Sequence, residues 1–331
     1  MPKLPVTFAC GLYDRMTALY TGEVRAEGID LNFMAVHHPR DLFDRMVGGL
    51  EFDASELSAS EYITRFAAGQ CPFVALPVFP SRMFRHGFIA VDSRVIREPK
   101  DLEGKRVGVQ LYTMTAAIWI RGLLQHDHGV DLSAIQWIEG AMESPKPHGR
   151  PTVLPPLKPV TIVSNTSGKS LSQLLEQGDV QAVIGADLPS SFGKSPHIKR
   201  LFPDFREAEK AYYRRTKIFP IMHLVVLRRD FHERHPFVAT SLFNAFNESK
   251  ALAHERMRYL GALRYMLPWL PAELDEIEDV FGGDPWPYGI EPNRQTLEAL
   301  VQFLADQSMI AKPIAVDDLF VNIRSHNWGS R

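Results

Sequence analysis

The sequence predicts an α/β protein of two lobes, with the second lobe inserted into the first and a ligand cleft between them. Short apolar segments alternate with amphipathic ones, which is typical of layered α/β folds. This alternation starts afresh after Pro99, and a strongly apolar strand at 221–227 follows late in the chain. We therefore expect a discontinuous first lobe over 1–95 plus 220–331 and an inserted second lobe over 96–219.

The first lobe is expected to begin with four strands separated by three helices. Each strand is apolar or alternates with period two, and each helix carries apolar residues three and four positions apart. Ser58 and Glu61 have the spacing of a capping box for the third helix. The expected strands are 6–9, 28–34, 52–55 and 73–79, and the expected helices are 16–26, 39–47 and 58–66.

The second lobe continues the same pattern, and helices close the chain. Residues 143–159 hold six prolines, which predicts an extended loop. The crossings between lobes are expected near 88–97 and 218–228. The expected strands of the second lobe are 105–109, 135–138 and 180–184, and its helices run from Thr113 or Thr115 to Gln125 and over 171–176. The closing helices are expected at 236–257, 259–267, 271–280 and 295–307.

Composition excludes several classes of protein. The 331 residues are 45% hydrophobic and 23% charged, enough apolar material for a sizeable core. A net charge of −2 gives no support to nucleic-acid binding, and no apolar run approaches the roughly 20 residues of a membrane helix. The N-terminal segment lacks a signal-peptide core, and two distant cysteines, Cys10 and Cys71, fit a reducing compartment. We therefore expect a cytoplasmic protein.

Common cofactor motifs are missing from the sequence. No GxGxxG follows a strand, and no GxSxG is present. The GKS triplets at 168–170 and 193–195 lack the earlier glycine of a phosphate loop. His37 and His38 follow a strand end, where neighbouring side chains point in opposite directions, so at most one would face a ligand.

The most informative cluster lies where the fourth strand ends. Residues 79–86 read FPSRMFRH and include Ser81, Arg82, Arg85 and His86. Guanidinium groups match the geometry of carboxylates, and histidine suits proton transfer near neutral pH. A solvated turn is the alternative interpretation, although the flanking aromatic residues make it less favourable.

Other strand ends supply further candidates. Glu56 follows the third strand and suits a proton or a cation, whereas hydroxyls at a helix start suit an anion. His223 lies inside the apolar crossing strand, where either a hydrogen-bonded core residue or a cleft residue fits. The remaining candidates are Tyr13, Ser55, Tyr112, Thr113 and Thr115.

Long blocks of the chain resemble one known family. Residues 71–86 (CPFVALPVFPSRMFRH), 212–223 (YYRRTKIFPIMH) and 284–289 (DPWPYG) are similar to the 4,5-dihydroxyphthalate decarboxylase family, as are 114–122 and 265–270. The resemblance runs over nearly the whole chain. It implies a type II periplasmic-binding-protein-like fold without an export signal. It also implies a carbon-carbon lyase of phthalate degradation that removes one carboxylate from 4,5-dihydroxyphthalate to give protocatechuate.

The resemblance turns the candidate residues into a mechanism. Arg82 and Arg85 would hold the carboxylates of the aromatic acid, and His86 or His223 would protonate the carbon that loses carbon dioxide. Glu56, with Tyr13, would accept a hydrogen bond from the para hydroxyl. The further substrate contacts would be Ser81, Ser55, Tyr112, Thr113 and Thr115.

No cofactor is expected, because the phenol can serve as the electron sink. A divalent metal held by His37, Glu56, His86 and His223 is an alternative.

Two rival functions stay open from the sequence. One is a cytosolic binding protein for aromatic carboxylates, and the other is a related lyase acting on a different aromatic acid. Clustered histidines favour an enzyme, because a carboxylate binder needs no proton shuttle. The expected partner is a small aromatic dicarboxylate, with no nucleic acid and no membrane. A homo-oligomer is also expected, through apolar residues near the C-terminus such as Met309, Ile310 and Leu319.

Overall fold

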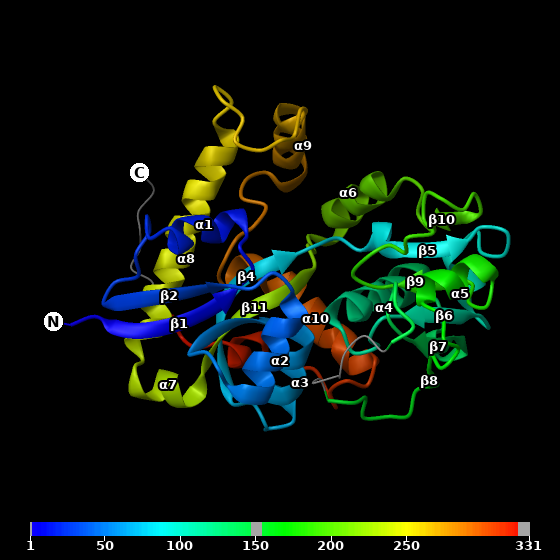
Figure 1. Ribbon diagram of the computed structural model, residues 1–331, viewed down its shortest axis with the longest axis horizontal. Coiled ribbons are helices and arrows are strands. Elements are labelled where there is room, and N and C mark those ends of the chain that lie inside the picture. The colour runs from blue at the N-terminus through cyan, green and yellow to red at the C-terminus, as the bar shows by residue number, and fades with distance from the viewer. Residues whose placement is uncertain (1, 147–153, 324–331) are drawn as a thin grey trace.

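Two lobes, each with its own β-sheet, make up the computed structural model, which describes residues 2–146 and 154–323 (Figure 1). The first sheet has the strand order β2-β1-β3-β11-β4, and the second has the order β10-β5-β9-β6-β7-β8. The chain leaves the first sheet after β4 and returns to it at β11. The second lobe is therefore inserted into the first, as the sequence predicts.

The first sheet mixes parallel and antiparallel strands. β1 pairs in parallel with β2 and β3, whereas β11 runs antiparallel to both β3 and β4. Its strands are β1 (Leu4–Cys10), β2 (Ile29–Ala35), β3 (Ala54–Ser58), β4 (Phe73–Arg82) and β11 (Ile221–Arg228). The helices around it are α1 (Asp14–Tyr20), α2 (Pro39–Gly49), α3 (Ala59–Ala67), α7 (Arg229–Arg234), α8 (Phe237–Arg258), α9 (Leu270–Phe281) and α10 (Arg294–Asp306).

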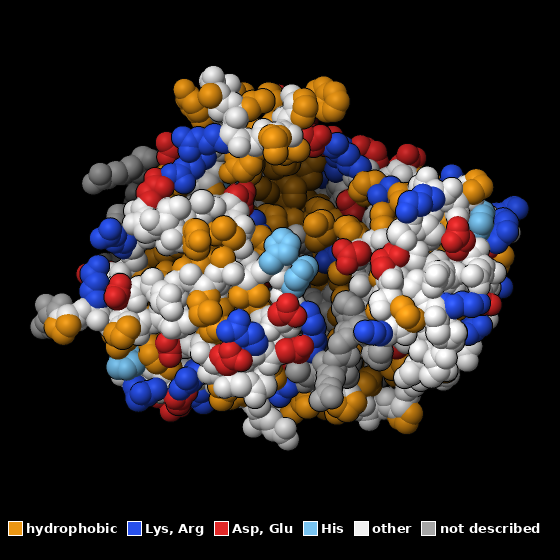
Figure 2. Space-filling view, in the orientation of Figure 1, with side chains coloured by type: hydrophobic (Ala, Val, Ile, Leu, Met, Phe, Trp, Pro, Cys, Tyr) orange, Lys and Arg blue, Asp and Glu red, His pale blue; other side chains and the backbone are white. Residues whose placement is uncertain are grey.

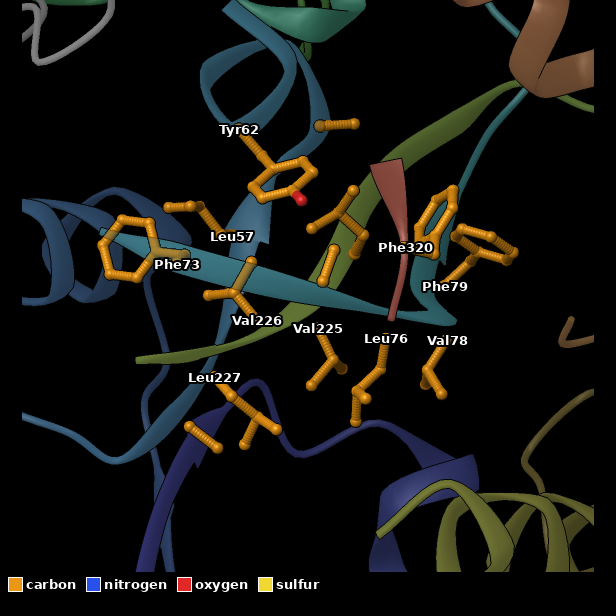
Figure 3. Packing of buried hydrophobic residues seen from close by; sticks show 14 of the residues in the cluster. Leu57, Tyr62, Phe73, Leu76, Val78, Phe79, Val225, Val226, Leu227 and Phe320 are labelled. Carbon is orange, nitrogen blue, oxygen red and sulfur yellow. The ribbon is translucent and has the colours of Figure 1, made fainter. Parts of the chain in front are cut away.

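The core of the first lobe is centred on β3, β4 and β11. Leu76, Val225 and Leu227 are completely buried on one face of the sheet, and Phe73, Phe79 and Val226 are completely buried on the other (Figure 3). Each fully buried side chain of this kind stabilises the fold by about 1.5–3 kcal/mol. The β11 strand is therefore held firmly between β3 and β4, and residues near its first end have fixed positions.

Three apolar residues near the C-terminus, Met309, Ile310 and Leu319, are also buried in the core of the first lobe. They were expected to contact a neighbouring subunit, and for these residues that expectation is wrong. The expected homo-oligomer stays a prediction and would need another surface.

The second lobe is smaller and has two apolar clusters, one on each side of its sheet. Its strands are β5 (Ile89–Asp92), β6 (Arg106–Val109), β7 (Gln136–Glu139), β8 (Ile162–Ser164), β9 (Ala182–Ile184) and β10 (Ile198–Arg200). Its helices are α4 (Thr115–His128), α5 (Leu171–Gln177) and α6 (Phe205–Thr216).

Helix α4 connects the lobes by packing on both of them. Trp119 belongs to the core of the first lobe, whereas Ile120 belongs to that of the second. Gly122 lies so close to Phe303 of α10 that a Cβ atom there would come within 2.0 Å of the ring. The Trp119 indole also donates a hydrogen bond of 2.8 Å to the Ile221 carbonyl. The lobes are thus in contact through α4 as well as through the two connecting segments.

The first crossing comes earlier than the sequence suggests. The strand β5 already belongs to the second sheet, where it pairs antiparallel with β9 and β10. The crossing therefore lies at 83–88 rather than 88–97, ahead of the expected boundary between residues 95 and 96.

Several helix predictions need correction. Residues 259–267 form no helix, consistent with Gly261 within the segment and Pro268 just after it. The first helix ends at Tyr20 rather than at residue 26, before Gly22 with its positive φ of 75°. Helix α6 was not predicted, because its composition is polar and only Tyr212 is buried. The proline-rich loop is irregular at 143–146 and 154–159, and its centre lies outside the described residues.

Candidate active site

A histidine at the first end of β11 faces the space between the lobes. In the sheet, His223 lies opposite Ser58 of β3 on one side and Ser81 of β4 on the other. Its side chain is partly exposed in an otherwise buried strand, and its ring packs edge-to-face on Phe43 of α2 at 5.0 Å. The alternative in which His223 is only a core residue is therefore wrong.

A cavity of about 300 Å³ opens in front of this histidine, with walls from both lobes. Figure 2 shows this face of the molecule hollowed between its two halves. Four residues predicted from the sequence line the cavity, namely Ser81, Arg85, Thr115 and His223. Other lining residues include His38, Arg40, Ser58, Gln110, Asp187 and Met222.

Glu56 lies behind His223 and is fully buried. The His223 Nδ1–H donates to Glu56 Oε1 at 2.6 Å, and the Tyr13 hydroxyl donates to the same oxygen at 2.7 Å. The Gly11 amide and the Cys10 thiol donate to Oε2 at 3.0 and 3.2 Å. These four hydrogen bonds fix the orientation of the carboxylate. The other ring nitrogen of His223, Nε2, is not used in them and is available to a ligand in the cavity.

The carboxylate of Glu56 is held in its charged form. Burial alone raises the pKa of Glu56, but hydrogen bonds from His223, Gly11 and Tyr13 outweigh that effect and lower the pKa to about 2. Burial and the nearby Glu56 charge raise the pKa of Tyr13, which therefore stays a hydrogen-bond donor. Because an ionised carboxylate only accepts hydrogen bonds, the His223 proton must sit on Nδ1. We expected Glu56 to contact the substrate hydroxyl, and that expectation is wrong because four protein donors saturate it.

Arg85 supplies the positive charge of the cavity wall. Its guanidinium is buried, and burial lowers its pKa to about 10, so it stays charged at neutral pH. Its contacts are the Met222 sulfur at 3.3 Å and the Ala186 carbonyl at 3.3 Å, with the Phe88 ring 4.9 Å away. Within the described part of the chain, no carboxylate lies within ion-pairing distance of it. The charges of Asp187 and Glu209 act on Arg85 only from beyond that distance, and a buried guanidinium without a direct ion pair is a ready seat for a ligand carboxylate.

Two residues of the FPSRMFRH segment do not reach the cavity. Arg82 donates hydrogen bonds to the Asn293 side chain and the Pro287 carbonyl, which anchors the 284–293 segment to β4. His86 packs against the rings of Phe202 and Tyr212, and burial lowers its pKa to about 4. Arg82 therefore cannot clamp a carboxylate in this cavity, and His86 cannot donate a proton there.

The start of α4 contributes only Thr115 of the three predicted residues. Tyr112 is buried against Trp137 and Arg121, and the Thr113 side chain is also buried away from the cavity. Ser55 points to the opposite face of β3 from Glu56 and donates to a backbone carbonyl.

Thr115 links the lobes through a group of hydroxyls. Its Oγ1 lies 2.9 Å from Ser58 Oγ and accepts the Ser60 amide at 3.1 Å. The predicted capping box of Ser58 and Glu61 does not form. Ser58 is the N-cap residue of α3 without a capping side-chain hydrogen bond, and the Ser60 amide donates instead to Thr115 of the other lobe.

The residues of the alternative metal site are not brought together. His37 lines a neighbouring cavity of about 420 Å³ with Tyr13, whereas His38 faces the main cavity, and His86 lies apart. In residues 2–146 and 154–323, no three His, Cys, Asp or Glu side chains are arranged to hold a metal ion. Over the same ranges, no helix has both the length and the apolar character needed to cross a bilayer.

Sequence reasoning missed several residues that the structure brings to the site. Cys10 is the last residue of β1 and lies beside Glu56, and Gln110 directly follows β6 and lines the cavity wall. Both lie at the carboxyl ends of apolar strands, where α/β ligand sites form. That position was the available signal, but Cys10 carries no motif and reads as one more apolar core residue.

The fold is that of the periplasmic-binding-protein class. The sulfonate-binding protein SsuA of Escherichia coli has a TM-score of 0.53 at 13% identity, with 99% of this chain and 94% of that chain covered. A ligand-binding component of an import system from Staphylococcus aureus has a TM-score of 0.54 at 12% identity, covering 99% of this chain and all (100%) of that one. These similarities concern the fold alone.

Sequence similarity then identifies the family. The chain is 38% identical over 307 residues to 4,5-dihydroxyphthalate decarboxylase of Comamonas testosteroni, with 92% of each covered. It is 38% identical over 218 residues to the protein of the same name from Pseudomonas putida, covering 65% of this chain and 83% of that one. No protein-family model matches the chain. The chain belongs to the 4,5-dihydroxyphthalate decarboxylase family.

Proposed function

We propose that this protein is a carboxy-lyase that converts 4,5-dihydroxyphthalate to protocatechuate and carbon dioxide, with His223 as the proton donor. The observation that carries the mechanism is the hydrogen bond between His223 and the buried Glu56, beside a cavity with an unpaired Arg85. Membership of the decarboxylase family supports the reaction and the substrate.

The substrate would bind through its charges and its ring. Arg85 would hold the carboxylate that is retained, and Ser81 would donate a hydrogen bond to the substrate, whereas the Thr115 hydroxyl already donates to Ser60 and would only form part of the wall. The cavity volume of about 300 Å³ lies at the lower end of the usual range for small-molecule sites, which suits a single ring.

The proton transfer would proceed from Nε2 of doubly protonated His223 to the ring carbon that bears the departing carboxylate. The para hydroxyl releases electron density onto that carbon as the new C–H bond forms. The C–C bond to the carboxylate then breaks, its electron pair restores the aromatic ring, and carbon dioxide leaves. Throughout the reaction, the Nδ1 proton stays on His223 and remains hydrogen-bonded to Glu56. The Nε2 proton is replaced from water. A positioned general acid of this kind typically contributes about 10²- to 10⁴-fold.

In this scheme, neither a metal nor an organic cofactor is needed, because the phenol accepts the electron density. The two free cysteines fit a proposed cytoplasmic location.

The test is turnover of 4,5-dihydroxyphthalate by the purified protein with and without a chelator, in ordinary water and in deuterium oxide. We expect protocatechuate and carbon dioxide both with and without the chelator. In deuterium oxide, the product should carry one deuterium at the carbon that lost its carboxylate. Turnover that stops with chelator and returns with a divalent ion would refute the metal-free scheme. Saturable binding without turnover would instead indicate a binding protein for aromatic carboxylates.

A further inference from the structure

Two carboxylates are among the described residues that line the active-site cavity, and they differ in what they contact. Glu61 of α3 is completely buried and forms an ion pair with Arg65. Asp187 belongs to the second lobe and is exposed, and its side chain has no hydrogen bond or ion pair within the described part of the chain. Asp187 is therefore the better placed of the two to accept a hydrogen bond from a ligand.

The loop that carries Asp187 is held from both lobes. It follows β9, which runs parallel to β6, and the amide of Ala186 donates to Gln110 Oε1 at 3.1 Å. The Ala186 carbonyl accepts a hydrogen bond from Arg85 of the first lobe at 3.3 Å. Gly185 permits this close approach, because a Cβ atom there would collide with Gln110 Oε1. The backbone next to Asp187 is thus fixed beside Arg85, at the carboxyl end of a parallel strand, where α/β ligand sites form.

The cavity wall therefore carries opposite charges at two places. Burial lowers the pKa of Arg85, and the charge of Asp187 partly offsets this effect from beyond ion-pairing distance. The two side chains line the same cavity of about 300 Å³ without pairing with each other. Figure 2 shows acidic side chains on the second-lobe side of the hollow. A ligand that fits both charges has acceptor groups at one edge and donor groups at another.

4,5-Dihydroxyphthalate has this distribution of groups, because its two carboxylates occupy one edge of the ring and its two hydroxyls occupy the opposite edge. An ionised carboxylate only accepts hydrogen bonds, and its two oxygens can serve two neighbouring hydroxyls. The proposed reaction also benefits from such an acceptor, since a hydrogen bond from the para hydroxyl increases the electron density that the ring carbon receives. Glu56 cannot fill this role, because four protein donors already occupy its oxygens.

We propose that Asp187 binds the hydroxyl edge of the substrate and thereby selects dihydroxylated aromatic acids over acids that lack hydroxyls. This inference rests on the proposed decarboxylase function and adds the group that recognises the hydroxyls. The para hydroxyl keeps its proton in this hydrogen bond, which raises the electron density at the carbon that His223 protonates. A ligand with carboxylates alone would instead meet a like charge at Asp187, and that repulsion adds to the selectivity.

Steady-state kinetics of Asp187→Ala with 4,5-dihydroxyphthalate, and its inhibition by phthalate, which lacks both hydroxyls, test the proposal. We expect kcat/KM to fall by about 10- to 100-fold, the loss typical of a charged hydrogen bond. The inhibition constant of phthalate should stay the same or fall, because a like charge has been removed. Asp41→Ala is the matched control and should leave both values unchanged, since Asp41 is an exposed carboxylate of α2 that does not line the cavity.

Other results would overturn the proposal. Equal weakening of substrate and phthalate would show that Asp187 only shapes the cavity, and an unchanged kcat/KM would show that it does not contact the hydroxyls. A wild type without turnover would refute the decarboxylase function, and calorimetric dissociation constants of the two compounds would then test Asp187 separately. In that case, a wild type that binds phthalate as tightly as 4,5-dihydroxyphthalate would refute hydroxyl recognition. Circular dichroism checks that each variant is folded.

Discussion

Glu56 and His223 lie on neighbouring antiparallel strands, and their side chains meet at 2.6 Å behind the active-site cavity. The carboxylate is completely buried and does not line the cavity, so it can act on a ligand there only through the histidine. The pair resembles other orienting carboxylate–histidine pairs in one physical respect. The carboxylate fixes which ring nitrogen carries a proton and stabilises the positive charge of the ring.

Replacing His223 with Gln should lower kcat by about 10²- to 10⁴-fold, because the variant lacks the proposed proton donor. KM should change little, since Arg85, the proposed carboxylate ligand, is still present. Steady-state kinetics with 4,5-dihydroxyphthalate checks both values. His86→Gln is the control and should keep most of the wild-type kcat, because His86 lies against Phe202 and Tyr212. Equal losses in the two variants would contradict the assignment.

Replacing Glu56 with Gln should reduce stability in a pH-dependent way. The folded-state pKa of Glu56 is lowered from 4.5 to about 2, so the native state binds fewer protons than the unfolded state between these values. The stabilisation is therefore fully present above about pH 4.5 and is lost as the pH falls towards 2. Urea unfolding of both proteins at pH 7, 4 and 3 measures the difference in free energy, which should shrink as the pH falls. A difference that grows on acidification would disprove the charged carboxylate.

The two arginines of the FPSRMFRH segment should respond differently to substitution. Arg85→Met should raise KM by about 10- to 100-fold, the loss typical of a charged hydrogen bond to a ligand. Arg82→Met should instead lower the free energy of unfolding by about 1–3 kcal/mol, because the buried Oδ1 of Asn293 loses the hydrogen bond that Arg82 donates to it. Thermal unfolding and KM, measured on both variants, separate the two roles. A raised KM in Arg82→Met at unchanged stability would return Arg82 to the binding site.

Thr115→Val tests the hydroxyl link between the lobes. Valine keeps the shape of threonine but leaves Ser58 and the Ser60 amide without their partner. We expect a loss of about 1–3 kcal/mol in the free energy of unfolding. Thr115→Ser retains the hydroxyl and should recover most of that loss. A loss for Thr115→Ser as large as that for Thr115→Val would contradict this assignment, because serine keeps the hydroxyl and lacks only the methyl group.

The sheets could be predicted from the sequence better than the site. Apolar strands such as 73–79 and 221–227 have strong patterns, and both were found close to their observed positions. Helix α6 was missed because only one of its residues is buried. Its main contacts are with α9 and the first crossing, and no local sequence pattern shows such contacts.

The site was predicted in part, and the failures have a common cause. Arg82 is the last residue of β4, whereas Arg85 and His86 follow in the crossing segment, where the chain no longer alternates with period two. Which of these three side chains faces the cavity therefore depends on the path between the lobes. By contrast, Glu56 and His223 both lie within strands, and the continuous antiparallel register of β3 and β11 places them on the same face of the sheet, although the pairing of β11 with β4 is irregular at His223.

The close packing at Gly122 sets the width of the active-site cavity from a distance. Gly122 lies two turns along α4 from Thr115, and α4 approaches α10 closely only because this position has no side chain. A larger residue there would push α4 away from α10, and Thr115 at the start of the same helix forms part of the cavity wall. The shape of the cavity therefore depends on a contact between the Gly122 backbone and the Phe303 ring that the substrate never touches.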